Sequence, residues 1–78
     1  MTMDENRYFG IKDGKGGYDG LILQEFKDGG LTLYYMSQTG WVEDNRLITD
    51  LRDADTTAID PATASDIAQT RFHQPLER

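Results

Sequence analysis

A glycine-rich stretch near the N-terminus is the closest approach to a phosphate-binding motif in this sequence. It reads Gly14-Lys15-Gly16-Gly17-Tyr18-Asp19-Gly20. A dinucleotide-binding loop has the pattern G-x-G-x-x-G between a strand and a helix, and a P-loop ends in Gly-Lys-Ser/Thr. Asp19 stands where the third glycine is required, and a strand is predicted to follow, so the helix N-terminus that attracts an anion is missing. We therefore interpret this stretch as a hairpin loop and expect no bound cofactor.

An acidic segment further along the chain begins like a calcium-binding loop. Asp53, Asp55 and Thr57 place oxygen atoms at the first, third and fifth positions. The sixth position requires glycine and is Ala58, and the twelfth requires a bidentate glutamate and is Ala64. We expect a solvated acidic loop and no metal site. Weak association of a divalent cation with the loop Asp53–Asp60 is the alternative at this point.

Side chains for acid–base or nucleophilic catalysis are scarce. His73 is the single histidine, it lies in a predicted C-terminal tail, and the chain has no cysteine. A general base needs a fixed position beside the proton it removes, and a nucleophile needs such a base. Carboxylates such as Glu25, Glu43 and Asp44 are numerous, but their spacing singles out no pair. We therefore expect no catalytic residues and predict that the protein is not an enzyme.

Length and charge exclude several further classes of protein. The 78 residues include 14 acidic and 8 basic side chains, for a formal charge of −6, which disfavours direct binding of nucleic acid. No apolar run is long enough to cross a membrane, and the start of the chain lacks the pattern of a signal peptide. The length fits one small domain, residues 1–78, which we expect in the cytoplasm. Most of the acidity lies between Glu43 and Asp66, where the local charge is −5.

The distribution of glycine indicates how the chain is organised. Seven of the eight glycines precede residue 31, and an alanine-, threonine- and aspartate-rich half follows. This order of strands before helices predicts an α+β fold: a small antiparallel β-meander of three or four strands, followed by one or two short C-terminal helices packed on one face. The expected strands are 7–12, 18–27, 31–37 and a short one at 40–43. Residues 1–6 and 73–78 are predicted to be disordered tails.

The turn Asp28-Gly29 predicts a β-hairpin between the second and third strands. A two-residue turn sets Phe26 opposite Leu31 on one face, and Leu23 opposite Tyr34 on the other. Apolar residues then meet across the strands on both faces, which a three-residue turn does not achieve. We therefore predict the two-residue register.

The second half of the chain carries two helix signals. Asp44 is a candidate N-cap for a helix over 45–52, although a strand is the competing assignment for this segment. Asp60 and Pro61 predict the start of a last helix, and Pro75 its end. We expect its apolar side to consist of Ala64, Ile67, Ala68 and Phe72.

The hairpin register assigns a core face and leaves a second apolar face. The predicted core comprises Phe9, Ile11, Ile22, Phe26, Leu33, Tyr35, Leu51, Ile67 and Phe72. An antiparallel sheet with one wet side alternates cleanly between apolar and polar residues, and this one does not. We therefore expect a cover over the second face, which helices, the first strand or another molecule would supply. The predicted interaction surface on this side comprises Leu21, Leu23, Tyr34 and Met36, together with Trp41.

These observations favour a small acidic protein without chemistry of its own. The leading hypothesis is a protein–protein interaction or accessory module that binds a protein partner or forms a homodimer through its sheet. The alternative is an acidic decoy that occupies a basic, nucleic-acid-binding surface of a partner protein. Neither hypothesis involves a membrane.

Overall fold

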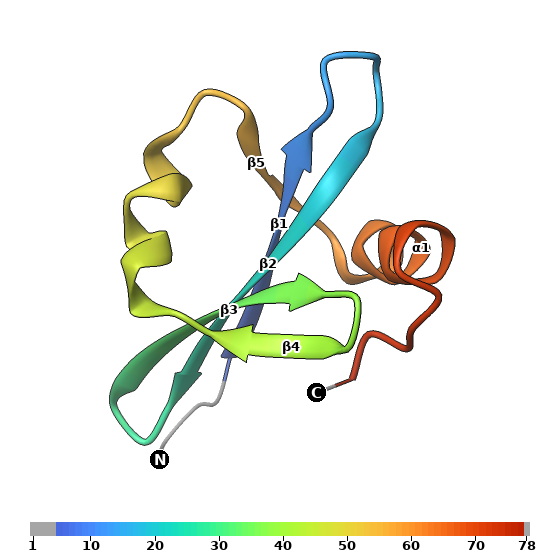
Figure 1. Cartoon of the computed structure of the whole chain (residues 1–78). Helices are drawn as coiled ribbons and strands as arrows, with labels where there is room; N and C mark the ends of the chain where they lie inside the picture. Colours follow the sequence, from blue (N-terminus) through green and yellow to red (C-terminus); the bar gives the residue numbers. More distant parts are fainter. Residues whose placement is uncertain (1–4, 78) are drawn as a thin grey trace.

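The protein folds as one five-stranded antiparallel sheet with helices on its two sides (Figure 1). The computed structural model describes residues 5–77. The strand order across the sheet is β4-β3-β2-β1-β5. In chain order the elements are β1 (Glu5–Lys12), β2 (Tyr18–Lys27), β3 (Gly30–Ser37), β4 (Gly40–Glu43), the 3₁₀-helices η1 (Asn45–Ile48) and η2 (Asp50–Arg52), β5 (Thr56–Ile59) and α1 (Pro61–Arg71).

The predicted hairpin between β2 and β3 is confirmed, including its register. Phe26 lies opposite Leu31, and Leu23 opposite Tyr34. Asp28 and Gly29 both have positive φ angles, 52° and 78°, as a tight two-residue hairpin turn requires. The turn chemistry therefore determines which face each side chain of these two strands occupies.

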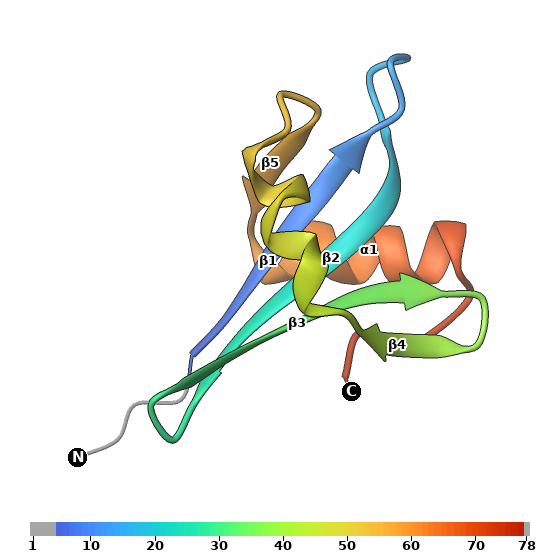
Figure 2. The same ribbon diagram turned by 60° about the vertical axis from the view of Figure 1, so that its left-hand side comes forward.

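The sheet is covered on both faces, whereas the sequence analysis placed the helices on one. Helix α1 lies on one face, and η1 and η2 lie on the other (Figures 1 and 2). On the α1 face, Leu21 and Met36 pack against Ala64, Ile67 and Ala68. On the opposite face the buried cluster is formed by Ile22, Leu33 and Leu47. The prediction that the helices pack on one face is therefore wrong, whereas the expected cover over the second apolar face is present, because β2 buries apolar residues on both of its sides.

A fifth strand, β5, lies where an acidic loop was expected. Residues Thr56–Ile59 pair with β1, with Tyr8 opposite Ile59 and Gly10 opposite Thr57. The prediction of three or four strands is therefore wrong. The segment is short and flanked by aspartates, so its β-branched residues give a weak local signal, and β1 supplies the neighbour that makes it a strand.

The predicted core needs two corrections. Tyr35 is 37% exposed, and five other predicted core residues are only partly buried: Phe9, Ile11, Phe26, Leu51 and Phe72. Ile22, Leu33 and Ile67 are the predicted core residues that are buried. Tyr35 and Phe26 lie on the face that η1 and η2 cover only in part. Conversely, the buried core includes residues that were assigned elsewhere or not assigned: Leu21, Leu23, Met36, Leu47, Ala64 and Ala68.

The segment after β4 is helical, as expected, and not the competing strand, but it forms two short 3₁₀-helices in place of one helix over 45–52. Asp44 caps η1 as predicted, since its carboxylate accepts a hydrogen bond from the Arg46 backbone N–H. Thr49 continues the helical backbone into η2. Only Leu47 of η1 is buried, and the adjacent Ile48 points away from the sheet at 44% exposure.

Helix α1 begins as predicted but ends earlier. The Asp60 carboxylate accepts a hydrogen bond from the Thr63 N–H at 2.7 Å, and Pro61 occupies the first turn. The helix ends at Arg71 rather than at Pro75, because His73 adopts a left-handed conformation with φ of 54°.

The ends of the described chain are held by hydrogen bonds and strand pairing. Gln74 donates from Nε2 to the carbonyl oxygen of Ser37 at 2.7 Å, and Trp41 donates from Nε1 to that of Leu76 at 2.9 Å. Residues 73–77, expected to be a disordered tail, thus contact the β3–β4 hairpin. Of the expected N-terminal tail, Glu5 and Asn6 belong to β1, and residues 1–4 lie outside the described residues.

Candidate functional site

The surface predicted for interaction, on the face of Leu21, is interior in the folded chain. Leu21, Leu23 and Met36 are 1%, 2% and 5% exposed, and Leu21 and Met36 pack directly against α1. Tyr34 and Trp41 are partly buried. The helix that the sequence analysis named as one possible cover occupies this face. Leu21, Leu23 and Met36 are therefore core residues and not part of an exposed surface, which corrects the prediction for these three; Tyr34 and Trp41 keep partial exposure.

The exposed apolar surface lies on the opposite side of the sheet. Among residues 5–77, the large hydrophobic side chains that are exposed all lie on the side away from α1. Tyr35 and Val42 are paired across β3 and β4, and both point to the face that holds Ile22. Leu31 lies on the same face beside the β2–β3 turn, and Ile48 lies on η1, which covers part of that face. We call this set the outer patch: Leu31 (41% exposed), Tyr35 (37%), Val42 (37%) and Ile48 (44%).

Charged side chains of both signs border the outer patch. Arg46 donates from Nε and Nη2 to the two carboxylate oxygens of Asp44, each at 3.0 Å. This contact and the Arg46 backbone N–H lower the pKa of Asp44 below its usual value. Near the β2–β3 turn, the guanidinium of Arg7 lies 5.8 Å from the ring centre of Phe26 and binds Glu5. An apolar centre with a charged, mixed-sign border is the usual organisation of a protein-binding surface.

The glycine-rich loop connects β1 to β2 as a hairpin, and Asp13 accepts hydrogen bonds from two of its backbone amides. The Asp13 carboxylate accepts hydrogen bonds from the backbone N–H groups of Lys15 (2.7 Å) and Gly17 (3.2 Å). It also accepts one from Nη2 of Arg71 on α1 at 3.1 Å. The two backbone donors first, and then the Arg71 charge, lower the pKa of Asp13. A phosphate group would compete with this internal carboxylate for the same donors.

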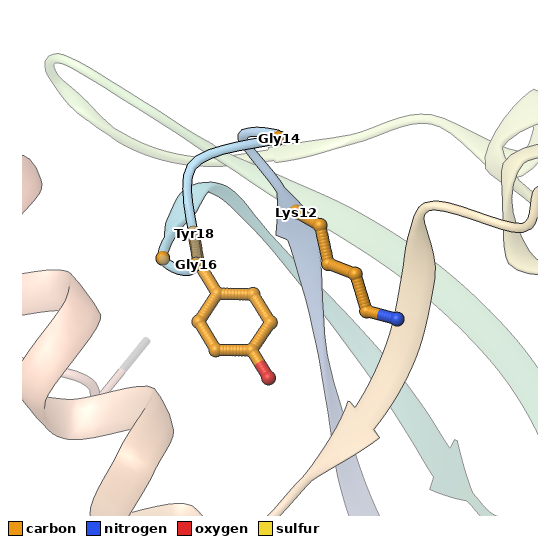
Figure 3. Close-up of a pocket in the computed structure, with 5 residues that line it drawn as sticks. Lys12, Gly14, Gly16 and Tyr18 are labelled. Atoms are coloured by element: carbon orange, nitrogen blue, oxygen red, sulfur yellow. The ribbon is translucent and has the colours of Figure 1, made fainter.

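A shallow hollow beside this loop holds few groups that recognise a ligand. It measures about 190 Å³ and is lined by glycine backbone together with Lys12 and Tyr18, whose side chains lie next to each other (Figure 3). The Tyr18 ring also covers Gly10 of β1, where an added Cβ would lie 2.5 Å from Cδ1 of the ring. Packing against Gly10 therefore accounts for the position of the ring without a ligand.

The residues considered for metal binding and catalysis remain apart. Within residues 5–77, no three histidine or acidic side chains gather at one point. The Asp53 carboxylate accepts the Asp55 N–H, and the Asp55 carbonyl accepts the Lys12 N–H, so this loop is fastened to β1. His73 is exposed. The acidic side chains Glu25 and Glu43 lie on β2 and β4, with β3 between them.

Leu31, Val42 and Ile48 of the outer patch were not predicted as surface residues, and Tyr35 was predicted in the core. One signal was available for Ile48. Leu47 and Ile48 are adjacent, so a single turn of helix can bury only one of them against the sheet. For Leu31 and Val42, exposure depends on how far η1 extends over the sheet, which is a tertiary property.

The fold is a small α+β domain with an antiparallel sheet between α1 and two 3₁₀-helices. No helix of the described residues has the length and apolar character needed to cross a membrane. Comparisons with protein-family models, curated proteins and solved structures give no match to this chain.

Proposed function

We propose that this protein is a non-catalytic interaction module that binds a protein partner through the outer patch. The observation that carries the proposal is the one-sided placement of the exposed large hydrophobic side chains, all on the side opposite α1. Large apolar side chains exposed together on one side of a domain, with charged residues beside them, are a feature of interaction sites. Covering the accessible part of each such side chain contributes on the order of 1 kcal/mol to binding.

The alternative of an acidic decoy receives less support from the geometry. Several acidic side chains of the second half have local structural partners. Asp44 and Asp60 cap helices, and Asp53 accepts a backbone N–H in its own turn. These contacts account for acidic residues at these positions without a basic partner. The expected cytoplasmic location stays a prediction.

Site-specific photo-crosslinking in the cells that produce the protein tests the proposal. A photoreactive phenylalanine analogue replaces Tyr35 or Ile48 in the outer patch, and Gln69 on the exposed side of α1 serves as the control position. We expect discrete protein adducts from the two patch positions and little adduct from Gln69. Equal yields at all three positions would refute the proposal. The mass of each adduct distinguishes a second copy of the chain from a different protein.

A further inference from the structure

Strand β4 ends one side of the sheet, and no strand among residues 5–77 pairs with its outer backbone groups. The Asp44 N–H donates to the Leu33 carbonyl at 2.9 Å, which marks Leu33 and Asp44 as a hydrogen-bonded position of the ladder, with the Leu33 N–H donating to Oδ1 of Asn45. Hydrogen-bonded positions alternate along an antiparallel ladder, so Val42 bonds inward to Tyr35. The N–H and C=O groups of Trp41 and Glu43 therefore point outward, away from β3. In Figures 1 and 2, β4 forms the border of the sheet, with no strand beyond it.

The two borders of the sheet differ in the apolar side chains that they expose. On β5 the exposed side chain is the small Ala58, and its strand neighbours are partly buried. On β4, Val42 stands at the middle of the outer strand and is exposed. The C-terminal residues approach β4 at the Trp41 side chain, which faces α1, and Val42 faces the other way. A large apolar side chain at the middle of an open strand can pack against its own copy across a two-fold axis, so β4 is the border that offers an apolar contact to a second copy.

We propose that two copies of this chain pair antiparallel through their β4 strands, with the two-fold axis at Val42. The inference rests on the proposed interaction function and names the partner as a second copy. The outward-pointing N–H and C=O groups of one β4 strand must face those of the other. This limits the symmetric registers to those centred on Trp41, Val42 or Glu43. The Glu43-centred register places two carboxylates opposite each other. The Trp41-centred register leaves the outward groups of Glu43 beyond the paired strand.

The Val42-centred register is complementary at each position. Trp41 of one copy and Glu43 of the second copy exchange both backbone hydrogen bonds. By symmetry, Glu43 of the first copy and Trp41 of the second do the same. On the α1 face, Glu43 lies opposite Trp41 rather than opposite another carboxylate. On the other face, Val42 meets Val42 of the second copy, with Tyr35 beside each. Tyr35 and Val42 of the two copies thus form one apolar surface across the interface. The contact is isologous, because both copies contribute the same residues.

A cysteine at the axis provides a direct test, since the chain contains none of its own. Residues at a non-hydrogen-bonded antiparallel pair have Cα atoms about 4.5 Å apart, within the range of about 4.4–6.8 Å that a disulfide spans. Val42→Cys should therefore oxidise to a covalent dimer in glutathione buffer. Ala58→Cys is the matched control, an exposed position on the opposite border strand. We expect at least about tenfold faster dimer formation for Val42→Cys than for Ala58→Cys.

Sedimentation equilibrium of the unmodified chain gives a second, independent measurement. We expect a monomer–dimer equilibrium, and Val42→Lys should raise its dissociation constant at least about tenfold because two ammonium groups would meet at the axis. Ala58→Lys should leave the constant unchanged, and circular dichroism checks the fold of each variant. Equal oxidation of the two cysteine variants, or an unmodified chain that stays monomeric up to about 1 mM, would overturn the β4 pairing. If photo-crosslinking then still yields patch-specific adducts with a different protein, the proposed function stands and only the second copy is refuted.

Discussion

Substituting Gly10 by alanine tests how the Tyr18 ring stabilises the β1–β2 hairpin. Gly10 is buried in β1, between Leu21 of β2 and Thr57 of β5. It is not among the residues with positive φ, so alanine can adopt its backbone conformation. The added Cβ, however, would lie 2.5, 2.8 and 3.1 Å from Cδ1, Cε1 and Cγ of the Tyr18 ring. The Tyr18 ring is rigid and cannot make room by rotating a single terminal atom. The whole ring or the strand must therefore shift.

The expected cost combines two opposing effects. Overpacking of this kind destabilises by about 1–3 kcal/mol. Replacing glycine by alanine also restricts the unfolded chain, which stabilises by about 0.4–1 kcal/mol. We therefore expect Gly10→Ala to lower the free energy of unfolding by about 1–2 kcal/mol. For a domain of this size that lowers Tm by roughly 5–15 °C.

Urea denaturation followed by the fluorescence of Trp41, the single tryptophan, measures this change. Gly30→Ala is the matched control, since a Cβ there meets only the Lys27 carbonyl oxygen at 3.5 Å. In a Tyr18→Ala background the clash is gone, so Gly10→Ala should become neutral or stabilising. The reasoning is refuted if Gly10→Ala and Gly30→Ala are equally stable, or if Gly10→Ala costs as much without the Tyr18 ring as with it.

Two further predictions concern the C-terminal residues and the response to acid. Trp41→Phe removes the donor to the Leu76 carbonyl, so the amides of residues 73–77 should exchange hydrogen faster while those of α1 are unchanged; unchanged exchange near Leu76 would contradict this. The pKa of Asp13 is lowered in the folded state by the Lys15 and Gly17 N–H groups and then by Arg71. A lowered pKa stabilises the fold at pH values above the unfolded-state pKa, and this stabilisation is lost as the pH falls through the folded-state pKa. The urea midpoint should therefore decline below about pH 4, and less steeply in Asp13→Asn; parallel pH profiles would contradict the assignment.

The features predicted correctly from the sequence are those that local chemistry determines. Asp28 and Gly29 favour one turn, and that turn sets the register of β2 against β3. Asp60 and Pro61 determine where α1 begins, because a carboxylate satisfies free N–H groups and proline needs none there. In both cases a few neighbouring residues contain the whole physical cause.

The features that were missed depend on segments far apart in the chain. Thr56–Ile59 is a strand because β1, more than forty residues earlier, provides a ladder for it. The covering of both faces depends on the chain crossing from one side of the sheet, at η1 and η2, to the other side at α1. No local pattern specifies that crossing. The interaction surface was predicted on the wrong face for the same reason. Which apolar side chains stay exposed depends on where η1, η2 and α1 pack against the sheet.

The distribution of apolar side chains strengthens the case for the outer patch. Hydrophobic residues make up only 37% of the chain, and the central strand β2 buries three consecutive ones, Leu21, Ile22 and Leu23. A short chain buries a small share of its surface and has few large apolar groups to leave exposed. Here four large ones are exposed on the side away from α1 and none of the described residues exposes one on the other side. Isolated exposed apolar residues are ordinary in proteins, but random placement would distribute them over both faces. One-sided exposure, with Val42 on an open border strand, is what a surface that pairs with another chain requires.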